Sequence, residues 1–184
     1  MGRWSWSNRN VVEECLSLDT AWLNRNGYFS GYRSGSIQWK DSAGDVSSSI
    51  GIVVSVDAES NLDSYIQFNY TVSNNFNGEK KNKDYKIHLD ATRCNFGGVR
   101  YWFICPLSVE DQYCGKRVGK IYLPPGGDYF GCRYCYDLTY RCQKEHDSRL
   151  DRLLNNPAEF LAQLESKKNC TLAVKAAAKF LNWD

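Results

Sequence analysis

The sequence predicts an α+β fold, in which an antiparallel β-meander is followed by a four-cysteine module and flanked by helices. Three observations predict this fold. Residues 36–101 alternate between polar and apolar side chains with the period of a β-strand. Four clustered cysteines follow, and the end of the chain is rich in helix formers. We expect three parts: a helix-plus-sheet domain at residues 1–104, the cysteine module at 105–141, and C-terminal helices at 142–184.

The composition is that of a folded protein. Of the 184 residues, 42% are hydrophobic and 14% aromatic, including 12 Tyr and 6 Trp, which argues against a disordered chain. The net charge of +2 is too small to indicate nucleic-acid binding by itself. The first residues contain no apolar signal segment, and no run of about 18 apolar residues occurs. We therefore expect a soluble, cytoplasmic protein with no membrane partner.

Two short helices are predicted before the sheet. The first starts at Asn10, a favoured N-cap residue, ahead of the segment VVEECLSL. The second starts at Asp19 and ends at Gly27, a residue type common at helix C-termini. Trp22 and Leu23 of the second helix are expected to anchor it to the sheet.

Five segments have the alternation and the β-branched and aromatic content of strands: SIQWK, SSIGIVVSV, SYIQFNYTV, DYKIHLDAT and VRYWFIC. Turn-forming segments separate them, so the strands are expected to pair in sequence order as an antiparallel meander. The last strand ends in Trp102-Phe103-Ile104, directly before Cys105. The cysteine module is therefore expected to continue from the sheet without a linker.

Two cysteine pairs make up the module: Cys105 with Cys114, and Cys132 with Cys135. The second pair is a C-x-x-C, whereas eight residues separate the first pair. Between the pairs, RVGKIYL and DYFGC read as two strands joined by the turn PPGG. Such a hairpin brings four thiolates around one tetrahedral ion, and a closed set of four thiolates is typical of structural zinc. We predict one structural Zn²⁺.

Several details of this site are left open. Gly115 and Gly131 are predicted to let the backbone approach the thiolates closely. Cys142 with His146 is an alternative to the looser pair, and four disulfides are an alternative use of eight cysteines. A chain of this length without a signal peptide disfavours the disulfides. The scattered cysteines are expected to be buried thiols: Cys15, Cys94, Cys142 and Cys170.

Helices are predicted after Tyr140. Asp147 or Ser148 caps the first, Pro157 starts the second, and the segment TLAVKAAAKFLNW forms an Ala-rich last helix.

The segment WFICPL…YCGKRVGKIYLPPGGDYFGCRYCYDLTYRCQ resembles the signature of a poorly characterised bacterial zinc-ribbon family. Its members carry a W-F-x-C-P…C-G-x-R…L-Y-L-P…F-x-C-R-x-C-x-x-L-x-Y block. A Leu-Asp pair and a Ser-x-x-W pattern often precede it, and SLDTAW and SGSIQW match both here. The resemblance covers most of residues 10–145. It implies a zinc-ribbon protein of bacteria or their mobile elements, and it implies no established activity.

The predicted ribbon is basic and aromatic. Residues 113–144 contain six basic and two acidic side chains, whereas residues 1–100 contain 11 of each. Cations that neutralise phosphates, beside aromatic rings that stack on bases, are typical of nucleic-acid-binding surfaces. We therefore predict a non-catalytic protein that binds DNA or RNA. The residues expected to bind are Lys116, Arg117, Lys120, Arg133, Tyr122 and Tyr134.

Aromatic residues and arginine are also enriched at protein interfaces. The alternative prediction is therefore a protein–protein adaptor, an assembly subunit or an inhibitor. In that case Trp4, Trp6 and the C-terminal segment AAAKFLNWD would be docking elements.

Known catalytic motifs are missing from the sequence. His88 is followed by Leu-Asp and Cys132 is preceded by Gly, so the pattern of a zinc deaminase fails. The metalloprotease pattern H-E-x-x-H does not occur. No spacing singles out a Mg²⁺-binding pair among Asp57, Glu59, Asp63 and Asp90. We predict no catalytic residue and no small-molecule substrate, and we expect His88 to be an ordinary strand residue.

Overall fold

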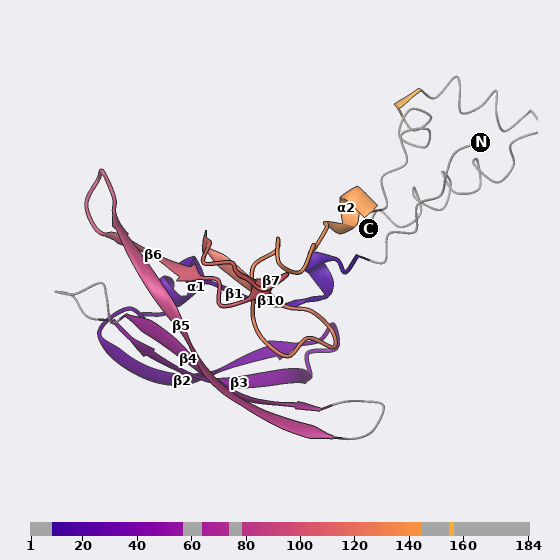
Figure 1. Cartoon of the computed structure of the whole chain (residues 1–184), viewed down its shortest axis with the longest axis horizontal. Helices are drawn as coiled ribbons and strands as arrows, with labels where there is room; N and C mark the ends of the chain where they lie inside the picture. The colour runs from indigo at the N-terminus through magenta and orange to yellow at the C-terminus, as the bar shows by residue number, and fades with distance from the viewer. Residues whose placement is uncertain (1–8, 57–63, 74–78, 145–154, 157–184) are drawn as a thin grey trace, which may run out of the picture. The chain divides into compact units, whose positions relative to one another are not determined.

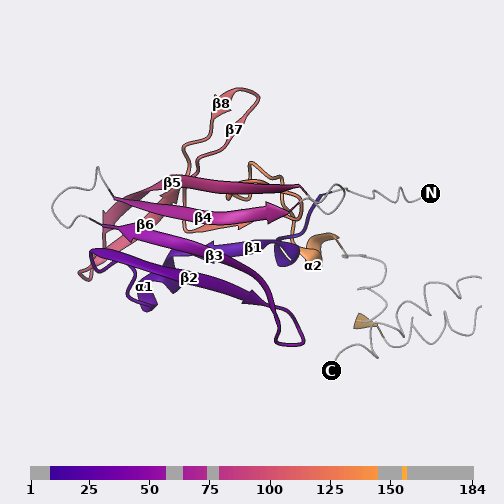
Figure 2. The same ribbon diagram turned by 90° about the horizontal axis from the view of Figure 1, so that it is seen from below.

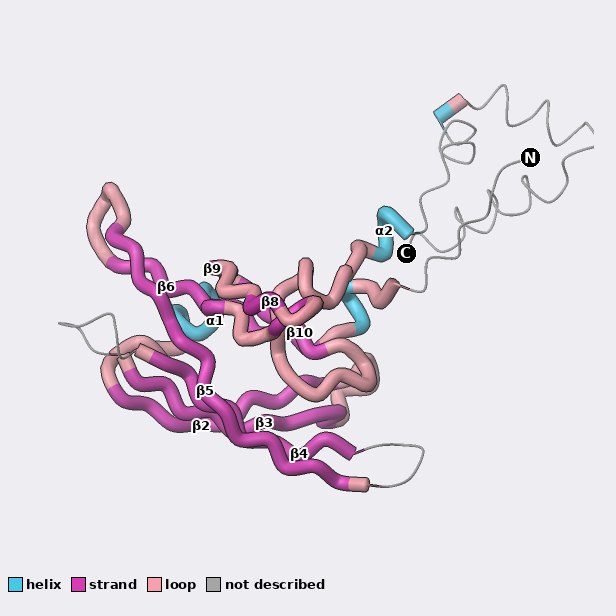
Figure 3. The backbone as a smooth tube through the Cα atoms, in the orientation of Figure 1, coloured by secondary structure: helices cyan, strands magenta, loops and turns pink. Residues whose placement is uncertain are grey.

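The computed structural model in Figure 1 describes residues 9–56, 64–73, 79–144 and 155–156. The chain divides into two compact units, Met1–Tyr140 and Arg141–Asp184. Strands and bridges take up 52% of the described residues and helices 11%, so the described chain is mostly antiparallel β (Figure 3). The α+β prediction is therefore wrong.

The helical content of the described residues is small. The α-helices α1 (Thr20–Arg25) and α2 (Arg141–Lys144) are both short. The helices predicted from Asp147 onward lie almost entirely outside the described residues.

A six-stranded antiparallel sheet is the main element, and it confirms the predicted five-strand meander. Its strand order is β2-β3-β4-β5-β6-β9, so one short strand from the cysteine module extends the meander. Figure 2 shows β2–β5 of this sheet side by side. The strands are β2 (Tyr32–Lys40), β3 (Val46–Ser55), β4 (Tyr65–Ser73), β5 (Lys80–Arg93), β6 (Val99–Ile104) and β9 (Arg117–Val118).

The sheet curls because β5 pairs with two different strands along successive parts of its length. Residues 80–88 of this strand pair with β4, and residues 89–93 pair with β6. In Figure 1 the long ribbon of β5 crosses from the β2–β4 layer toward β6. The curl leaves an inner face that the rest of this unit covers.

The segment predicted as a first helix from Asn10 forms a strand instead. After a 3₁₀ turn at Val12–Glu14, β1 (Leu16–Asp19) pairs antiparallel with β10 (Lys120–Leu123). The partner strand lies about a hundred residues later in the chain. The gain in backbone hydrogen bonds and in burial of Leu18 depends on that distant partner, which overrides the local helix signal.

The second predicted helix is confirmed as α1. The Asp19 carboxylate accepts a hydrogen bond from the Ala21 N–H at 2.7 Å, as expected of an N-cap residue. Gly27 follows the helix with φ 71°, a left-handed conformation that favours glycine. Leu23 is fully buried, whereas Trp22 is 38% exposed, so Leu23 is the anchor.

The core of this unit joins the sheet to the cysteine module. Phe68 of β4, Phe103 of β6 and Ile121 of β10 are fully buried in one cluster together with Phe130. Phe130 stacks on Phe68 with ring centroids 5.1 Å apart. The module therefore has no separate core of its own.

Two tyrosines hold the turn between the cysteine pairs on the sheet: Tyr70, which is buried, and Tyr85, which is partly buried. The Tyr70 hydroxyl donates to the Asp128 carbonyl at 2.8 Å, and the Tyr85 hydroxyl accepts from the Phe130 N–H at 2.8 Å. The two hydroxyls lie 3.0 Å apart. Burial raises the pKa of both tyrosines, so both remain neutral donors at ordinary pH.

Candidate metal centre and its surface

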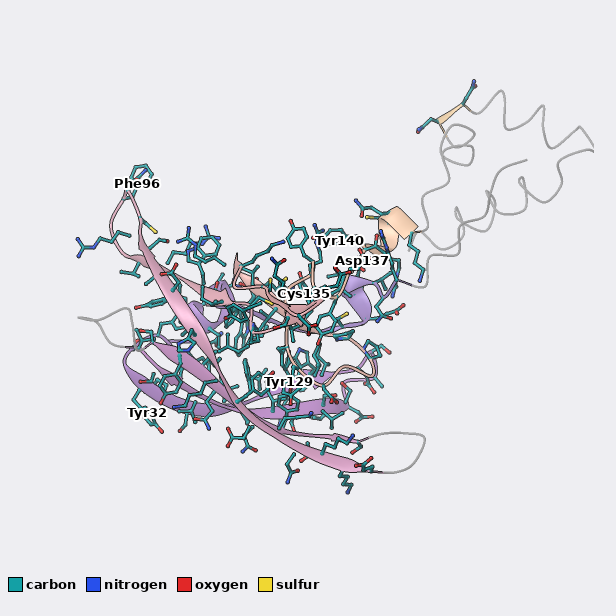
Figure 4. The ribbon with its side chains drawn as sticks, in the orientation of Figure 1. Tyr32, Phe96, Tyr129, Cys135, Asp137 and Tyr140 are labelled. Atoms are coloured by element: carbon teal, nitrogen blue, oxygen red, sulfur yellow. The ribbon has the colours of Figure 1, made fainter. Side chains whose placement is uncertain are left out.

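The four predicted cysteines come together. The sulfur atoms of Cys105, Cys114, Cys132 and Cys135 all lie within 4.8 Å of one another, and Figure 4 shows Cys135 at this cluster. The Sγ–Sγ distances are 3.8 Å for Cys105–Cys135, 3.8 Å for Cys114–Cys132 and 3.5 Å for Cys132–Cys135. A disulfide requires about 2.05 Å, so these thiols are not bonded to one another. The group is able to hold a metal ion.

The end of β6 and the start of β9 position the first pair. Cys105 directly follows Ile104, and its N–H donates to the Lys116 carbonyl at 3.0 Å. Cys114 stands three residues before β9, which pairs with β6. The sheet edge therefore holds one half of the cluster.

A small hairpin explains the long spacing of the first pair. Strands β7 (Ser108–Val109) and β8 (Gln112–Tyr113) pair with each other, and Figure 2 shows the hairpin projecting from the rest of the fold. At its base the Cys114 N–H donates to the Leu107 carbonyl at 2.9 Å. Cys114 therefore sits beside Leu107, as it would in a C-x-x-C turn, and the hairpin is an insertion into that turn.

The second pair lies in a turn after Gly131, which bridges Tyr122 of β10. DYFGC thus forms a single bridge where a full strand was predicted. Two backbone N–H groups point at sulfur: Cys132 N–H donates to Cys105 Sγ at 3.3 Å, and Cys135 N–H to Cys132 Sγ at 3.4 Å. Such bonds stabilise and orient thiolate ligands.

The two glycines beside the cysteines have different roles. Gly115 has φ 55°, so it permits the left-handed backbone that follows Cys114. A Cβ atom on Gly131 would collide with the Leu107 side chain. Gly131 is therefore required for packing between the two halves of the module, which the sequence did not indicate.

Protein groups alone favour one thiolate in the cluster. A hydrogen bond from Cys105 lowers the pKa of Cys132 to about 4 and raises the pKa of Cys105. Burial raises the pKa of Cys135 to about 12. Four sulfurs this close repel one another when ionised, so full deprotonation requires a bound cation.

Of the other cysteines, the structure describes Cys15, Cys94 and Cys142, and none of the three is the fully buried thiol that was predicted. Cys15 is half-buried, its thiol donates to the Val11 carbonyl at 3.3 Å, and burial raises its pKa to about 11. Cys94 and Cys142 are exposed. Cys170 and His146 lie outside the described residues, and with them the Cys142–His146 alternative.

Four side chains next to the metal centre form what we call the basic–aromatic cluster: Lys116, Arg133, Tyr134 and Tyr140. Tyr134 is 64% exposed, and its ring centroid lies 4.7 Å from Lys116 Nζ and 5.3 Å from Arg133 Cζ. The same guanidinium lies 5.1 Å from the ring of Tyr140, which is 37% exposed. The structure thus brings together three of the six residues predicted to bind nucleic acid.

The other three predicted residues have different surroundings. Arg117 pairs with Asp90 at 3.0 Å, and Lys120 Nζ lies 5.7 Å from the Tyr122 ring centroid. Tyr122 is only 7% exposed, because β10 lies between β1 and Gly131. Its ring is therefore not available to stack on a base.

Tyr140 was not among the predicted binding residues. Tyr140 lies several residues after Tyr134 in the sequence, and this separation does not indicate that its ring contacts Arg133. The signal that could have found it is its position shortly after the C-x-x-C turn.

Other candidate sites are weak. His88 is an exposed residue of β5, as expected of an ordinary strand residue, and Asp90 is engaged by Arg117. Asp57, Glu59 and Asp63 lie outside the described residues. Within the described ranges, no helix is long and apolar enough to cross a membrane.

No protein-family model matches this chain, and no curated protein or solved structure shows significant similarity to it.

Proposed function

We propose that the protein is a zinc-ribbon protein that binds nucleic acid, in which one structural Zn²⁺ fixes the basic–aromatic cluster. The observation that carries the proposal is the exposed ring of Tyr134 with two cations on it, one residue before the ligand Cys135. Membership of the resembling zinc-ribbon family is part of this proposal.

The spacing of the sulfurs supports zinc. A tetrahedral ion with Zn–S bonds of about 2.3 Å places its ligands about 3.8 Å apart. The three measured Sγ–Sγ distances are 3.5–3.8 Å, close to that value. Four soft sulfur donors also suit iron, so metal analysis must separate the two. A set of four protein ligands leaves no position for a substrate or water, which favours a structural role.

The surface chemistry supports nucleic acid. Lys116 and Arg133 are both placed on one exposed aromatic ring, and the second ring, Tyr140, extends the platform. A base that stacks on Tyr134 would have two cations within reach of its phosphate. Binding by this surface should weaken steeply with salt, because phosphate neutralisation releases counterions.

Two measurements test the proposal. Metal analysis of purified protein should return one zinc per chain; no zinc, iron in its place, or more than one equivalent contradicts the metal assignment. Affinity for a generic duplex and a generic single strand should fall with salt, and Lys116→Gln should reduce that salt dependence. Lys40→Gln is the matched control, because Lys40 is an exposed lysine of β2.

A protein partner is the second candidate, and the β7–β8 hairpin favours it. Val109 and Tyr113 are 47% and 60% exposed on this projecting element, and its turn residues Glu110 and Asp111 are acidic. The hairpin would suit an adaptor, assembly subunit or inhibitor. The proposed docking residues Trp4 and Trp6 lie outside the described residues, as does the C-terminal segment.

A further inference from the structure

A fully exposed phenylalanine lies at the end of the β5–β6 hairpin. Figure 4 shows Phe96 at the tip of this hairpin, which projects from the fold, and its side chain is as exposed as in an extended peptide. At this end of the sheet, residues 90–93 of β5 pair only with residues 99–102 of β6 among the described strands. The tip is therefore a two-stranded ribbon that presents an aromatic ring to solvent.

The turn holds Phe96 in this position. Cys94 N–H donates to the Gly98 carbonyl at 3.1 Å, and Gly97 N–H donates to the Cys94 carbonyl at 3.0 Å. Gly97 and Gly98 have φ 87° and 81°, so the turn needs glycine at both positions. The backbone thus forms a closed loop, and Phe96 makes no contribution to the core.

Cations flank the exposed ring. Residues 91–101 contain Arg93 and Arg100 and no acidic residue. The Arg100 guanidinium lies 4.1 Å from the Trp102 ring centroid, and Trp102 Nε1 donates to Thr92 Oγ1 at 2.9 Å. The Arg100 guanidinium therefore lies over an aromatic ring that is itself hydrogen-bonded, while Arg93 makes no ion pair within the described part of the chain.

The hairpin leads from this tip to the metal centre. Arg100 and Trp102 alternate along β6 and so share one face, and Arg117 lies on the same face because it is opposite Ile104. The six residues of β6 span about 17 Å at about 3.3 Å per residue. At 3.4 Å per base step, this is roughly the length of five base pairs.

We propose that the tip is a wedge, in which Phe96 inserts between stacked bases of the nucleic acid bound by the basic–aromatic cluster. Arg93 and Arg100 then contact the phosphates on either side. This inference rests on the proposed function. One aromatic side chain is enough to unstack a base step, whereas membrane binding needs a larger apolar surface, and the exposed large apolar side chains at this described tip are Phe96 and Val99 alone.

A fluorescent base tests the wedge. A duplex containing 2-aminopurine is dim while its bases are stacked and brightens where a side chain separates them. The wild-type protein should raise this fluorescence. Phe96→Ala should abolish the rise and weaken binding about five-fold or more, whereas Phe96→Trp should keep both. Tyr32→Ala is the matched control, because Tyr32 is a 70% exposed aromatic on β2 and should change neither.

The outcomes separate the wedge from the proposed function. Equal affinity and equal fluorescence for Phe96→Ala, with weakened binding by Lys116→Gln, overturn the wedge and leave the proposed function standing. Absence of binding by the wild-type protein to duplex DNA, single-stranded DNA and single-stranded RNA overturns both. Loss of binding to phosphatidylserine-containing vesicles by Phe96→Ala, without any change toward nucleic acid, also overturns the wedge and assigns the tip to a membrane. Unchanged thermal unfolding of Phe96→Ala confirms that the variant is folded.

Discussion

Phe130 stacks on Phe68 across the interior at a centroid distance of 5.1 Å, and Phe130 is only two residues before Cys132 of the cysteine cluster. The core of the sheet and the metal centre are thus joined through one short segment. The segment is also held by the hydrogen bond that the Phe130 N–H donates to the Tyr85 hydroxyl. Loss of packing at Phe130 should therefore weaken metal binding, and loss of the metal should destabilise the core.

The first prediction concerns this link. Phe130→Ala should lower the free energy of unfolding by about 3–5 kcal/mol, because it leaves a large cavity in a fully buried site. It should also speed zinc release to a chelator. Urea unfolding and a chromophoric chelator measure the two effects. Phe96→Ala is the control, because it makes the same substitution at an exposed position. Zinc release at the wild-type rate in Phe130→Ala would contradict the coupling between core packing and zinc binding.

The second prediction concerns the metal itself. Cys132→Ser should abolish stoichiometric zinc binding, because the Cys132 sulfur lies 3.8 Å from that of Cys114 and 3.5 Å from that of Cys135, and its N–H donates to the Cys105 sulfur. Zinc removal by a chelator should likewise destabilise the sheet, since structural zinc contributes directly to folding. Metal analysis and circular dichroism measure these effects. Cys94→Ser, at an exposed cysteine, should retain one zinc.

The third prediction is a pH dependence. Burial raises the pKa of Tyr70, Tyr85 and Tyr136 in the folded state, that of Tyr136 to about 12. Unfolded tyrosines ionise at about 10, so above that pH the unfolded chain loses protons that the folded chain keeps. Stability is therefore complete below about pH 10 and decreases as the pH rises toward the folded pKa values, by up to about 1.4 kcal/mol per pH unit for each tyrosine.

Tyr85→Phe isolates one of these groups. The variant should lose about 1–3 kcal/mol at neutral pH, because the buried Phe130 N–H loses its acceptor. Its stability should fall less steeply with alkaline pH than that of the wild type. Urea unfolding from pH 8 upward measures both. An identical alkaline slope in the two proteins would show that Tyr85 does not contribute to it.

The fourth prediction follows from the bond between Cys114 and Leu107. If the β7–β8 hairpin is an insertion, replacement of residues 108–113 by Gly-Gly should close the same hydrogen-bonded pair with a two-residue turn. We expect this variant to keep one zinc and its thermal stability, and to bind nucleic acid as before. Loss of zinc would show that the hairpin is needed to position Cys114. Loss of a co-purifying protein alone would favour the adaptor function.

An element of this structure could be predicted where its signal lies within its own residues, and could not be predicted where it depends on a segment far away in the sequence. The meander could be predicted because each strand carries its own alternation and each turn its own turn formers. β1 could not, because LSLD becomes a strand only against KIYL, about a hundred residues later. The burial of Tyr122 was missed for a related reason. The strand itself was predicted, but Ile121, Tyr122 and Leu123 are all buried because both sides of β10 are covered, and alternation along the chain cannot show that.

The grouping of the four cysteines was predictable because cysteine spacing is a local chemical signature, although the inserted hairpin hid the first C-x-x-C turn. The surface was predictable only as a composition. Which of its cations meet which rings depends on the path of the turns, so Arg133 lies between Tyr134 and Tyr140 while Arg117 is paired with Asp90. The sequence did not single out Phe96, because a turn sequence does not tell how far its strands extend beyond the sheet.

The last prediction separates stacking from charge at the basic–aromatic cluster. Tyr134→Ala should weaken nucleic-acid binding about five-fold to a hundred-fold, because a stacked base contributes about 1–3 kcal/mol. The salt dependence should remain, since no cation is removed. Lys116→Gln and Arg133→Gln should each reduce the slope of log affinity against log salt by about 1. Fluorescence anisotropy over a salt series measures both quantities.

Tyr134→Phe is the matched control for the ring. It keeps the stacking surface and the two cation–ring contacts, so its affinity should remain close to that of the wild type. Lys40→Gln, which removes the same charge from β2, should leave the slope unchanged. If Lys40→Gln and Lys116→Gln reduce the slope equally, the binding reflects overall charge and the cluster has no specific role. If Tyr134→Ala binds as well as Tyr134→Phe, no base stacks on this ring and the cluster holds phosphate by charge alone.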